Sequence, residues 1–296
     1  MPILQKIVQV GRLIVPRGWA PVIRSLTRMF PSLNRYTARM KTGDALILDL
    51  AQPMCLGYFF DGGVPHNQGL DRIMAQVLVP GSVFVDVGAN IGYYTKLARK
   101  LVGYQGLVHA FEPLPDALPL LFANALGRKC NLNLENKCLF VGHNGSENVT
   151  VHTLAVGARP GQLDFYVQPA GDTSSLAPSP IARVVRVNVT TLDFTLRDLQ
   201  RLDLLKVDVE GFELEVFQGA IETLRRHQPV IEFEFLDGYS KARGLTLDDY
   251  KAILEPLGYS FFWSNHSSSG GIVVTGPRSS DVVAVPPKWI SRLGLR

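Results

Sequence analysis

The stretch VFVDVGANIGYYT, residues 83–95, decides the fold class. Its first five residues are a short apolar run that is typical of a buried strand. Two glycines, Gly88 and Gly92, then bracket a tight loop, and residues 93–102 have helical character with Gly103 as a stop signal. The stretch therefore predicts a strand, a loop and a helix in direct succession, the unit that starts many ligand-binding α/β sheets.

The same alternation of strands and helices continues toward the C-terminus. Because strands that alternate with helices of ten to fifteen residues form parallel pairs, the pattern predicts an α/β fold with a Rossmann-like, mainly parallel sheet and helices on both faces. One helix is expected after the fourth of these strands, with apolar residues at Leu214, Phe217, Ile221 and Leu224. The expected strands are residues 83–87, 107–112, 149–156, 202–209 and 229–235, with final antiparallel strands at 259–263 and 281–285.

Three segments stand outside this alternation. Residues 1–42 form a basic amphipathic arm, since the first 43 residues hold eight Lys or Arg and no Asp or Glu. Residues 43–66 are predicted as a leading hairpin, with strands at 45–50 and 55–60. Residues 158–190 are predicted as an inserted hairpin. The whole of residues 43–296 is then one domain behind the arm.

The composition narrows the class of protein. No apolar run approaches the roughly 18 residues that span a bilayer, and the start lacks the order of a signal peptide. Cys55, Cys130 and Cys138 show no zinc-type spacing, so we expect reduced thiols in a cytoplasmic protein. The basic arm favours peripheral contact with an anionic membrane, or else a contact in a homo-oligomer. No base-methylation motif or aromatic-rich basic patch points to nucleic acid as a partner.

The glycine loop discriminates between ligands. A carboxylate at the end of the second strand, Glu112, is placed to bind two ribose hydroxyls, as in proteins that bind either nicotinamide dinucleotides or S-adenosylmethionine. The loop reads D-x-G-x-N-x-G, and Asp86 would repel a pyrophosphate but suits the ammonium and sulfonium of S-adenosylmethionine. Side chains at both glycines would obstruct the methionine part of that cofactor. The predicted cofactor-binding residues are Asp86, Gly88, Asn90, Gly92 and Glu112.

Three alternatives remain open. A nicotinamide-dependent oxidoreductase would use the same sheet, and a non-catalytic protein could keep the cofactor-binding fold. The loop could also be a plain strand-to-helix turn in which Asp86 caps the helix and Glu112 is merely exposed.

With these motifs the chain resembles the FkbM family of methyltransferases, from about residue 43 to residue 286. The resemblance implies a seven-stranded class I methyltransferase sheet, S-adenosylmethionine as cofactor, and O-methylation of a hydroxyl on a sugar, glycan or polyketide-like small molecule. The segments that carry it are FVDVGANIGYYT (84–95), HAFEP (109–113), LAVG (154–157), SSL (174–176), TLD (191–193), KVDVEGFELEVFQGA (206–220) and the strand that ends at Glu234.

Acceptor chemistry is expected after the fourth strand. An aliphatic hydroxyl stays protonated at neutral pH, so its methylation needs a base or a metal. Strand alternation places Lys206 and Asp208 on one side, and the predicted catalytic residues are Asp208 and Glu210. With Glu234 on the next strand, these carboxylates are also candidates for a Mg²⁺ site. The alternative is that Asp208 caps the following helix and Glu210 complements its dipole.

Overall fold

The computed structural model describes most of the chain in eleven segments. They are residues 4–5, 7–9, 18–63, 68–126, 139–140, 148–167, 174–175, 183–235, 243–264, 272–273 and 281–295. The chain divides into two compact units, one of Met1–Gln68 with Tyr166–Val184 and one of Gly69–Phe165 with Val185–Arg296. The expectations for Cys130 and Cys138 lie outside the described residues, whereas Cys55 is a buried free thiol.

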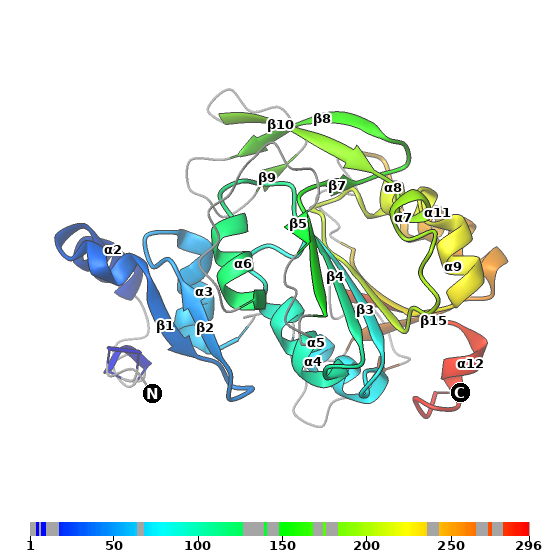
Figure 1. Cartoon of the computed structure of the whole chain (residues 1–296), viewed down its shortest axis with the longest axis horizontal. Coiled ribbons are helices and arrows are strands. Elements are labelled where there is room, and N and C mark those ends of the chain that lie inside the picture. The colour runs from blue at the N-terminus through cyan, green and yellow to red at the C-terminus, as the bar shows by residue number, and fades with distance from the viewer. Residues whose placement is uncertain are drawn as a thin grey trace. The chain divides into compact units, whose positions relative to one another are not determined.

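The larger unit is built on one sheet with the strand order β14-β13-β15-β12-β11-β3-β4-β6-β5 (Figure 1). Strands β6, β4, β3, β11 and β12 are parallel neighbours, and β15 is antiparallel to both β12 and β13. The predicted mainly parallel seven-stranded sheet is confirmed, with a two-residue strand added at each edge. The strands are β3 (Val83–Val87), β4 (Leu107–Phe111), β5 (Leu139–Phe140), β6 (Val149–His152), β11 (Leu204–Val207), β12 (Val230–Glu234), β13 (Ser260–Ser264), β14 (Ile272–Val273) and β15 (Asp281–Val285).

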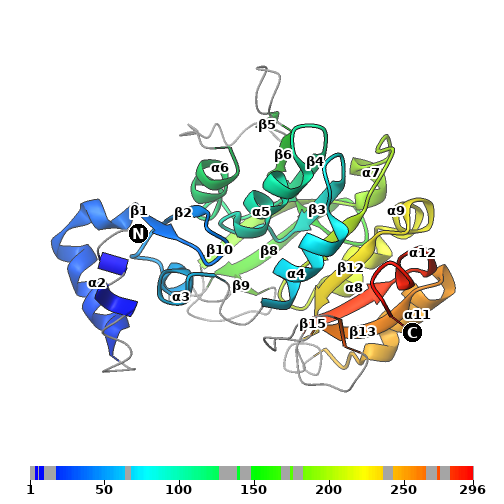
Figure 2. The ribbon, with the colours of Figure 1, turned by 90° about the horizontal axis from the view of Figure 1, so that it is seen from below.

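Helices cover both faces of this sheet (Figures 1 and 2). On one face lie α4 (Gln68–Val77), α5 (Tyr93–Val102) and α6 (Leu118–Leu126); on the other lie α8 (Glu213–Gln218), α9 (Ile221–His227) and α11 (Leu247–Leu254). The second face is filled by apolar side chains, among them a stacked Phe233–Tyr250 pair against Phe217. The described part of the chain contains no helix that is both long and apolar enough to cross a membrane.

The helix expected after the fourth strand is in fact two helices, α8 and α9. They are separated by Gly219 and Ala220. A Cβ atom on Gly219 would lie 2.1 Å from the carbonyl oxygen of Gly157, so the backbone here is pressed against another segment. Asp193 then caps α9, accepting hydrogen bonds from the backbone N–H groups of Glu222 and Thr223. The four apolar residues expected on one helix are therefore divided between two, with Leu214 and Phe217 on α8 and Ile221 and Leu224 on α9.

The smaller unit contains a hairpin, but not the one expected. Strand β2 (Ala45–Leu48) pairs with β1 (Tyr36–Arg39), and residues 55–60, expected as a strand, lie in helix α3 (Pro53–Asp61). Proline in the first turn and Gly62 at the C-cap, with φ of 65°, are start and stop signals of a helix. Burial of Cys55, Leu56 and Phe59 follows the helical spacing of one and four residues. This unit also contains α2 (Trp19–Met29), η1 (Pro31–Asn34) and the short strand β9 (Ser174–Ser175).

A second sheet has the strand order β7-β10-β8-β9. Its strands are β7 (Ala155–Val156), β8 (Gly161–Val167), β9 (Ser174–Ser175) and β10 (Arg183–Thr190). Strands β8 and β10 are neighbours within the range of the predicted inserted hairpin, and Arg186 binds Asp164 across them at 2.7 Å. The domain boundary at residues 42 and 43 stays a prediction.

Candidate active site

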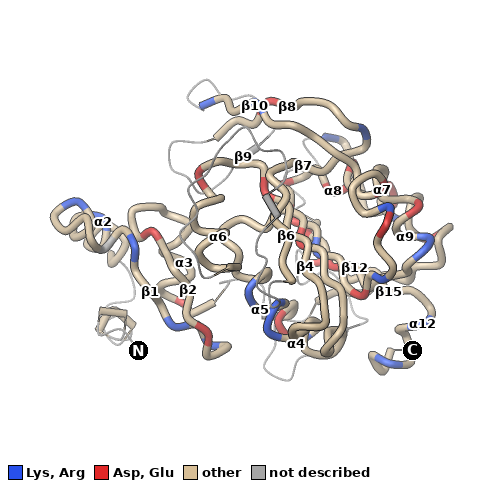
Figure 3. Tube along the Cα trace, in the orientation of Figure 1, with Lys and Arg blue, Asp and Glu red and all other residues tan. Residues whose placement is uncertain are grey.

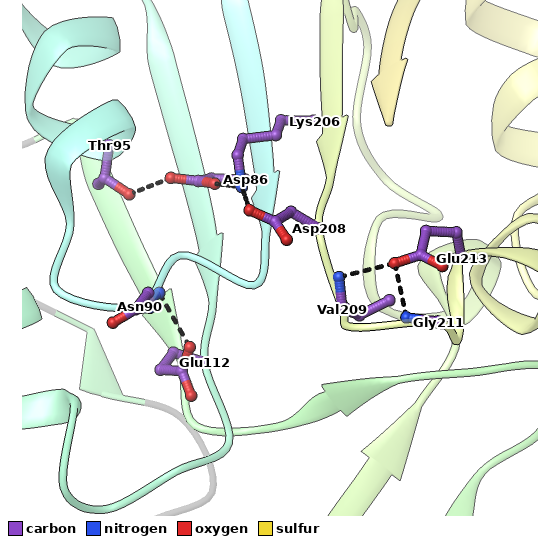
Figure 4. Close-up of polar contacts among 9 residues, drawn as sticks. All are labelled: Asp86, Asn90, Thr95, Glu112, Lys206, Asp208, Val209, Gly211 and Glu213. Atoms are coloured by element: carbon purple, nitrogen blue, oxygen red, sulfur yellow. Dashed lines mark hydrogen bonds and ion pairs between the residues drawn. The ribbon is translucent and has the colours of Figure 1, made fainter. Parts of the chain in front are cut away.

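The carboxyl ends of β3, β4, β11 and β12 lie along one edge of the sheet, because these strands are parallel neighbours. Asp86 lies within β3, Glu112 follows β4, Asp208 follows β11, and Glu234 ends β12. The pairing register places Lys206 opposite Asp86 on one side. The structure therefore brings predicted cofactor residues and the predicted base to one edge, and Figure 4 shows Asp86, Asn90, Glu112 and Asp208 there.

Both loop glycines are required by contacts within the protein. Gly88 has φ of +79°, and a Cβ atom there would lie 1.9 Å from the carbonyl oxygen of Asp208. Gly92 has φ of +84°, and its Cβ would lie 2.8 Å from the Leu121 side chain. The prediction that side chains at these positions would obstruct the cofactor is therefore incomplete. A side chain at either position would collide with other parts of the protein.

Glu112 is a buried carboxylate that organises the loop. Its Oε2 accepts a hydrogen bond from the backbone N–H of Asn90, and its Oε1 accepts one from that of Leu114, both at 2.9 Å. Burial raises the pKa of Glu112 to about 7, although these two N–H groups act to lower it. Asn90 has a left-handed φ of 51°, and its buried Oδ1 has no hydrogen-bond partner among the residues that the structure describes. The reading of Glu112 as an incidental exposed acid is therefore wrong.

Asp86 is fully buried, and its charge is opposed by a cation of the protein. Thr95 Oγ1 donates a hydrogen bond to Asp86 Oδ2 at 2.6 Å, and Lys206 Nζ lies 3.8 Å from Asp86 Oδ1. Burial raises the pKa of Asp86, and the charge of Lys206 acts against that rise. The N-cap residue of α5 is Gly92, which has no side chain, and the backbone N–H of Thr95 in the first turn of α5 hydrogen-bonds to Asp86 and acts to lower its pKa. This contact agrees with the alternative that Asp86 caps the helix.

Lys206 joins Asp86 to Asp208. Its Nζ donates a hydrogen bond to Asp208 Oδ2 at 3.0 Å, which confirms that both side chains lie on one side of the strand. Burial alone would lower the pKa of Lys206, but Asp208, Asp86 and Glu232 together outweigh it and raise that pKa. Helix α8 has Phe212 at its N-cap and no side-chain cap. Asp208 is therefore held by a lysine and does not cap the helix.

The loop after β11 is shaped by a residue that the sequence reasoning missed. Glu213 is buried, and its Oε1 accepts hydrogen bonds from the backbone N–H groups of Val209 and Gly211, each at 3.1 Å. Glu210 has φ of 55°, a conformation that costs a non-glycine residue about 1–2 kcal/mol. The signal for Glu213 was an acidic residue in the first turn of a helix, which sequence alone does not separate from ordinary dipole complementation.

The remaining carboxylates repel one another. Burial, and then the charges of Asp208 and Glu213, raise the pKa of Glu210 to about 7. Burial and then Asp208, Glu210 and Asp281 raise the pKa of Glu234 to about 9. Among the described residues, no group of three or more His, Cys, Asp or Glu side chains has the spacing of a metal site. A Mg²⁺ site at Asp208, Glu210 and Glu234 stays a prediction.

Comparison with known proteins gives a consistent family. The family model for the methyltransferase FkbM domain matches residues 86–261, which is more than half of the chain. A methyltransferase 1 of Beauveria bassiana is 31% identical over 152 residues, covering 47% of this chain and 58% of that protein. The 31-O-demethyl-FK506 methyltransferase FkbM of Streptomyces tacrolimicus is 28% identical over 187 residues, covering 54% and 68%. The crystal structure of a methyltransferase FkbM from Methylobacillus flagellatus has 18% identity and a TM-score of 0.44, covering 72% of this chain and 50% of that one.

Proposed function

The chain belongs to the FkbM family of methyltransferases, and from that membership we propose that it is an S-adenosylmethionine-dependent O-methyltransferase. The observation that supports the proposal most directly is that one edge of the sheet holds two carboxylates that differ in burial and in hydrogen-bond partners. Glu112 is buried and bound by backbone N–H groups, whereas the Asp208 side chain is 41% exposed and bound by Lys206. A buried, rigidly held carboxylate such as Glu112 suits the binding of a cofactor. A partly exposed carboxylate such as Asp208 suits contact with an acceptor that enters and leaves the site.

The residues of the loop fit the cofactor. Glu112 has acceptor capacity left on both oxygens after its two backbone bonds, as the binding of two ribose hydroxyls requires. Asn90 Oδ1 is a buried acceptor in need of a donor, and the ammonium of the cofactor has three N–H groups. Asp86 adds negative charge nearby, and Gly88 and Gly92 set the path of the loop. When bound, S-adenosylmethionine supplies an electrophilic methyl group on a sulfonium.

Asp208 is the proposed base. Its Oδ2 is bound by Lys206, which leaves Oδ1 to accept the proton of an acceptor hydroxyl. As that proton moves to Asp208, the hydroxyl oxygen forms its bond to the methyl group and the methyl–sulfur bond breaks, so a methyl ether and a neutral thioether leave. Glu210, two residues along the same loop, is proposed to bind and orient the acceptor.

The acceptor is proposed to be a hydroxyl of a sugar, a glycan or a polyketide-like small molecule. The name of the Streptomyces tacrolimicus relative specifies O-methylation for that protein. The test is to incubate methyl-labelled S-adenosylmethionine and the purified protein with an extract of cells that lack this gene. Label should enter a small molecule or glycan as an alkali-stable methyl ether. If the protein binds a nicotinamide dinucleotide but not S-adenosylmethionine, the oxidoreductase alternative is favoured. If it binds S-adenosylmethionine but labels nothing in the extract, a non-catalytic role is favoured.

Replacing Glu112 by Gln should weaken S-adenosylmethionine binding by about 10²-fold or more, since two hydrogen bonds to a charged acceptor contribute roughly 1.5–3 kcal/mol each. Isothermal calorimetry measures the affinity. The matched control is Asp203→Asn, because Asp203 is also buried and accepts a backbone N–H bond, from Val83, but at the opposite end of β11. Equal losses of affinity in both variants would mean that Glu112 supports the fold and not the cofactor.

The N-terminal segment is proposed to contact an anionic membrane. Helix α2 and its C-cap expose Val22, Met29 and Phe30, at 47%, 68% and 52%. Arg24 and Arg28 are exposed on the same helix, where Figure 3 shows the basic positions in blue. A short helix with exposed apolar and cationic side chains suits the interface of an anionic bilayer.

Charge reversal by Arg24→Glu with Arg28→Glu should lower binding to phosphatidylglycerol vesicles by roughly 30-fold or more, since each lost cation near such a surface contributes about 1 kcal/mol and the new carboxylates are repelled. Co-sedimentation in low salt measures this, with phosphatidylcholine vesicles for comparison. The control is Arg225→Glu with Arg226→Glu, two exposed arginines in the last turn of α9. Binding that does not depend on anionic lipid would remove the membrane proposal, and concentration-dependent self-association of the wild type would instead favour a homo-oligomer contact.

A further inference from the structure

A lysine ammonium is buried at the centre of the site, between carboxylates from two strands. The Lys206 side chain is 3% exposed, and its Nζ lies 3.0 Å from Asp208 Oδ2 and 3.8 Å from Asp86 Oδ1. Its Nζ also lies 5.3 Å from the centre of the Tyr94 ring, within the range of a cation–π contact. A buried ammonium is costly unless it is paired and hydrogen-bonded, so these contacts explain how the charge is retained here.

The two carboxylates differ in what else holds them. Asp86 is fully buried and receives a second hydrogen bond from Thr95 on helix α5. The Asp208 side chain is 41% exposed, and Lys206 is the partner bound to its Oδ2. The contacts therefore run in order from the core to the open edge: Thr95, Asp86, Lys206 and Asp208, as Figure 4 shows. The inner members are buried, and the outer one is partly exposed.

We propose that Lys206 is a positioning residue for methyl transfer, which fixes the Asp208 carboxylate by one oxygen so that the other meets the acceptor hydroxyl. Asp86 and Thr95 hold the ammonium in place from the interior. Lysine suits this place because its ammonium has three donors and can bind two carboxylates and a ring at once. The inference rests on the proposed function of Asp208 as the base. It gives Asp86 a role that acts through Lys206, beside its proposed effect on the cofactor.

The first test is Lys206→Met, which removes the charge and keeps most of the volume. The rate is measured as incorporation of label from methyl-labelled S-adenosylmethionine, at saturating cofactor, in the acceptor-containing extract. We expect a loss of about 10²-fold in rate, the usual scale for disabling a general base, with S-adenosylmethionine affinity within threefold by calorimetry. A crystal structure of the variant should show the Asp208 carboxylate displaced from its wild-type position.

The matched control is Lys251→Met. Lys251 Nζ also binds an aspartate at 3.0 Å, that of Asp248, but on the exposed side of helix α11. The same substitution there removes the same kind of bond away from the sheet edge, so both the rate and the affinity should stay at the wild-type values.

Chemical rescue separates positioning from a merely structural role. In Lys206→Ala the truncated side chain leaves room for a small amine. Added ethylammonium should therefore raise the rate of this variant at least tenfold, whereas ethanol at equal concentration should leave the rate unchanged. A wild-type rate in Lys206→Met would overturn the proposal. So would a rate that falls only in step with cofactor affinity and is not restored by ethylammonium.

A second variant covers the case in which Lys206→Met does not fold because Asp86 is left as an unpaired buried charge. The double variant Asp86→Asn with Lys206→Met removes the charges of this pair, leaves the buried Glu232 carboxylate in place, and should fold. Its rate at saturating cofactor should stay about 10²-fold low if Lys206 positions Asp208. A wild-type rate in the double variant would overturn the proposal. Failure of the proposed function itself would look different, since the wild-type protein would then neither bind S-adenosylmethionine nor label the extract.

Discussion

Asn in place of Asp208 is expected to lower the rate of methyl transfer by about 10²-fold or more, the usual scale for loss of a general base. The amide has nearly the same shape but cannot take a proton from the acceptor hydroxyl. S-adenosylmethionine affinity should stay within a few-fold, because the proposed ribose ligand, Glu112, follows another strand, β4, and is held by its own backbone bonds. Labelling in the extract measures the rate, and calorimetry measures the affinity.

The control for this variant is Asp248→Asn, which weakens a surface bond to Lys251 of the same length. If the carboxylates at the sheet edge hold a metal ion, a chelator should reproduce the defect in the wild type and added Mg²⁺ should reverse it. If Asp208 has only a structural role, its replacement should cost about 1 kcal/mol of stability, as for other lost hydrogen bonds, and little activity. Full activity in Asp208→Asn would place the base elsewhere.

Alanine in place of Gly88 should lower the free energy of unfolding by about 2–5 kcal/mol. The left-handed conformation costs a non-glycine residue about 1–2 kcal/mol, and overpacking costs about 1–3 kcal/mol. The overpacking arises because the new Cβ would lie 1.9 Å from the Asp208 carbonyl oxygen, a backbone atom of the loop after β11. Cofactor binding should fall because Gly88 sets the path of the cofactor loop, and methyl transfer should fall because the displaced segment carries Asp208.

Gly81→Ala is the matched control, since Gly81 has φ of +87° and no atom within 4 Å of the added Cβ. It should show only the conformational part of the loss. Thermal and urea unfolding of both variants measure the difference in stability. Equal stabilities would mean that the close approach of Gly88 to the loop after β11 does not exist in the protein. A stable Gly88→Ala that has lost only S-adenosylmethionine would restore the simpler interpretation, that this glycine makes room for the cofactor.

The positions of the central strands along the chain were predictable from sequence because each strand is a short apolar run with a loop and a helix behind it. Residues 83–87 and 204–207 are buried throughout, so no alternation was needed to recognise them. Residues 55–60 are also apolar but form a helix, because a run of that length fits either element and Pro53 with Gly62 decides between them. The division of α8 from α9 depended on a contact of Gly219 with Gly157, some 60 residues earlier in the chain.

The sequence by itself determined which chemical groups meet at the sheet edge. Acidic residues that directly follow parallel strands must gather there, so Glu112 and Asp208 were predictable without coordinates. Only the tertiary structure decided how each is held, because hydrogen bonds and burial depend on groups that are distant in sequence. Asp86 and Asp208 are 122 positions apart in the numbering, yet one ammonium, that of Lys206, binds between them. The sequence shows the three charged residues Asp86, Lys206 and Asp208 on two predicted strands. Packing brings them into contact, so that Asp86 and Lys206 are buried and Asp208 is partly exposed.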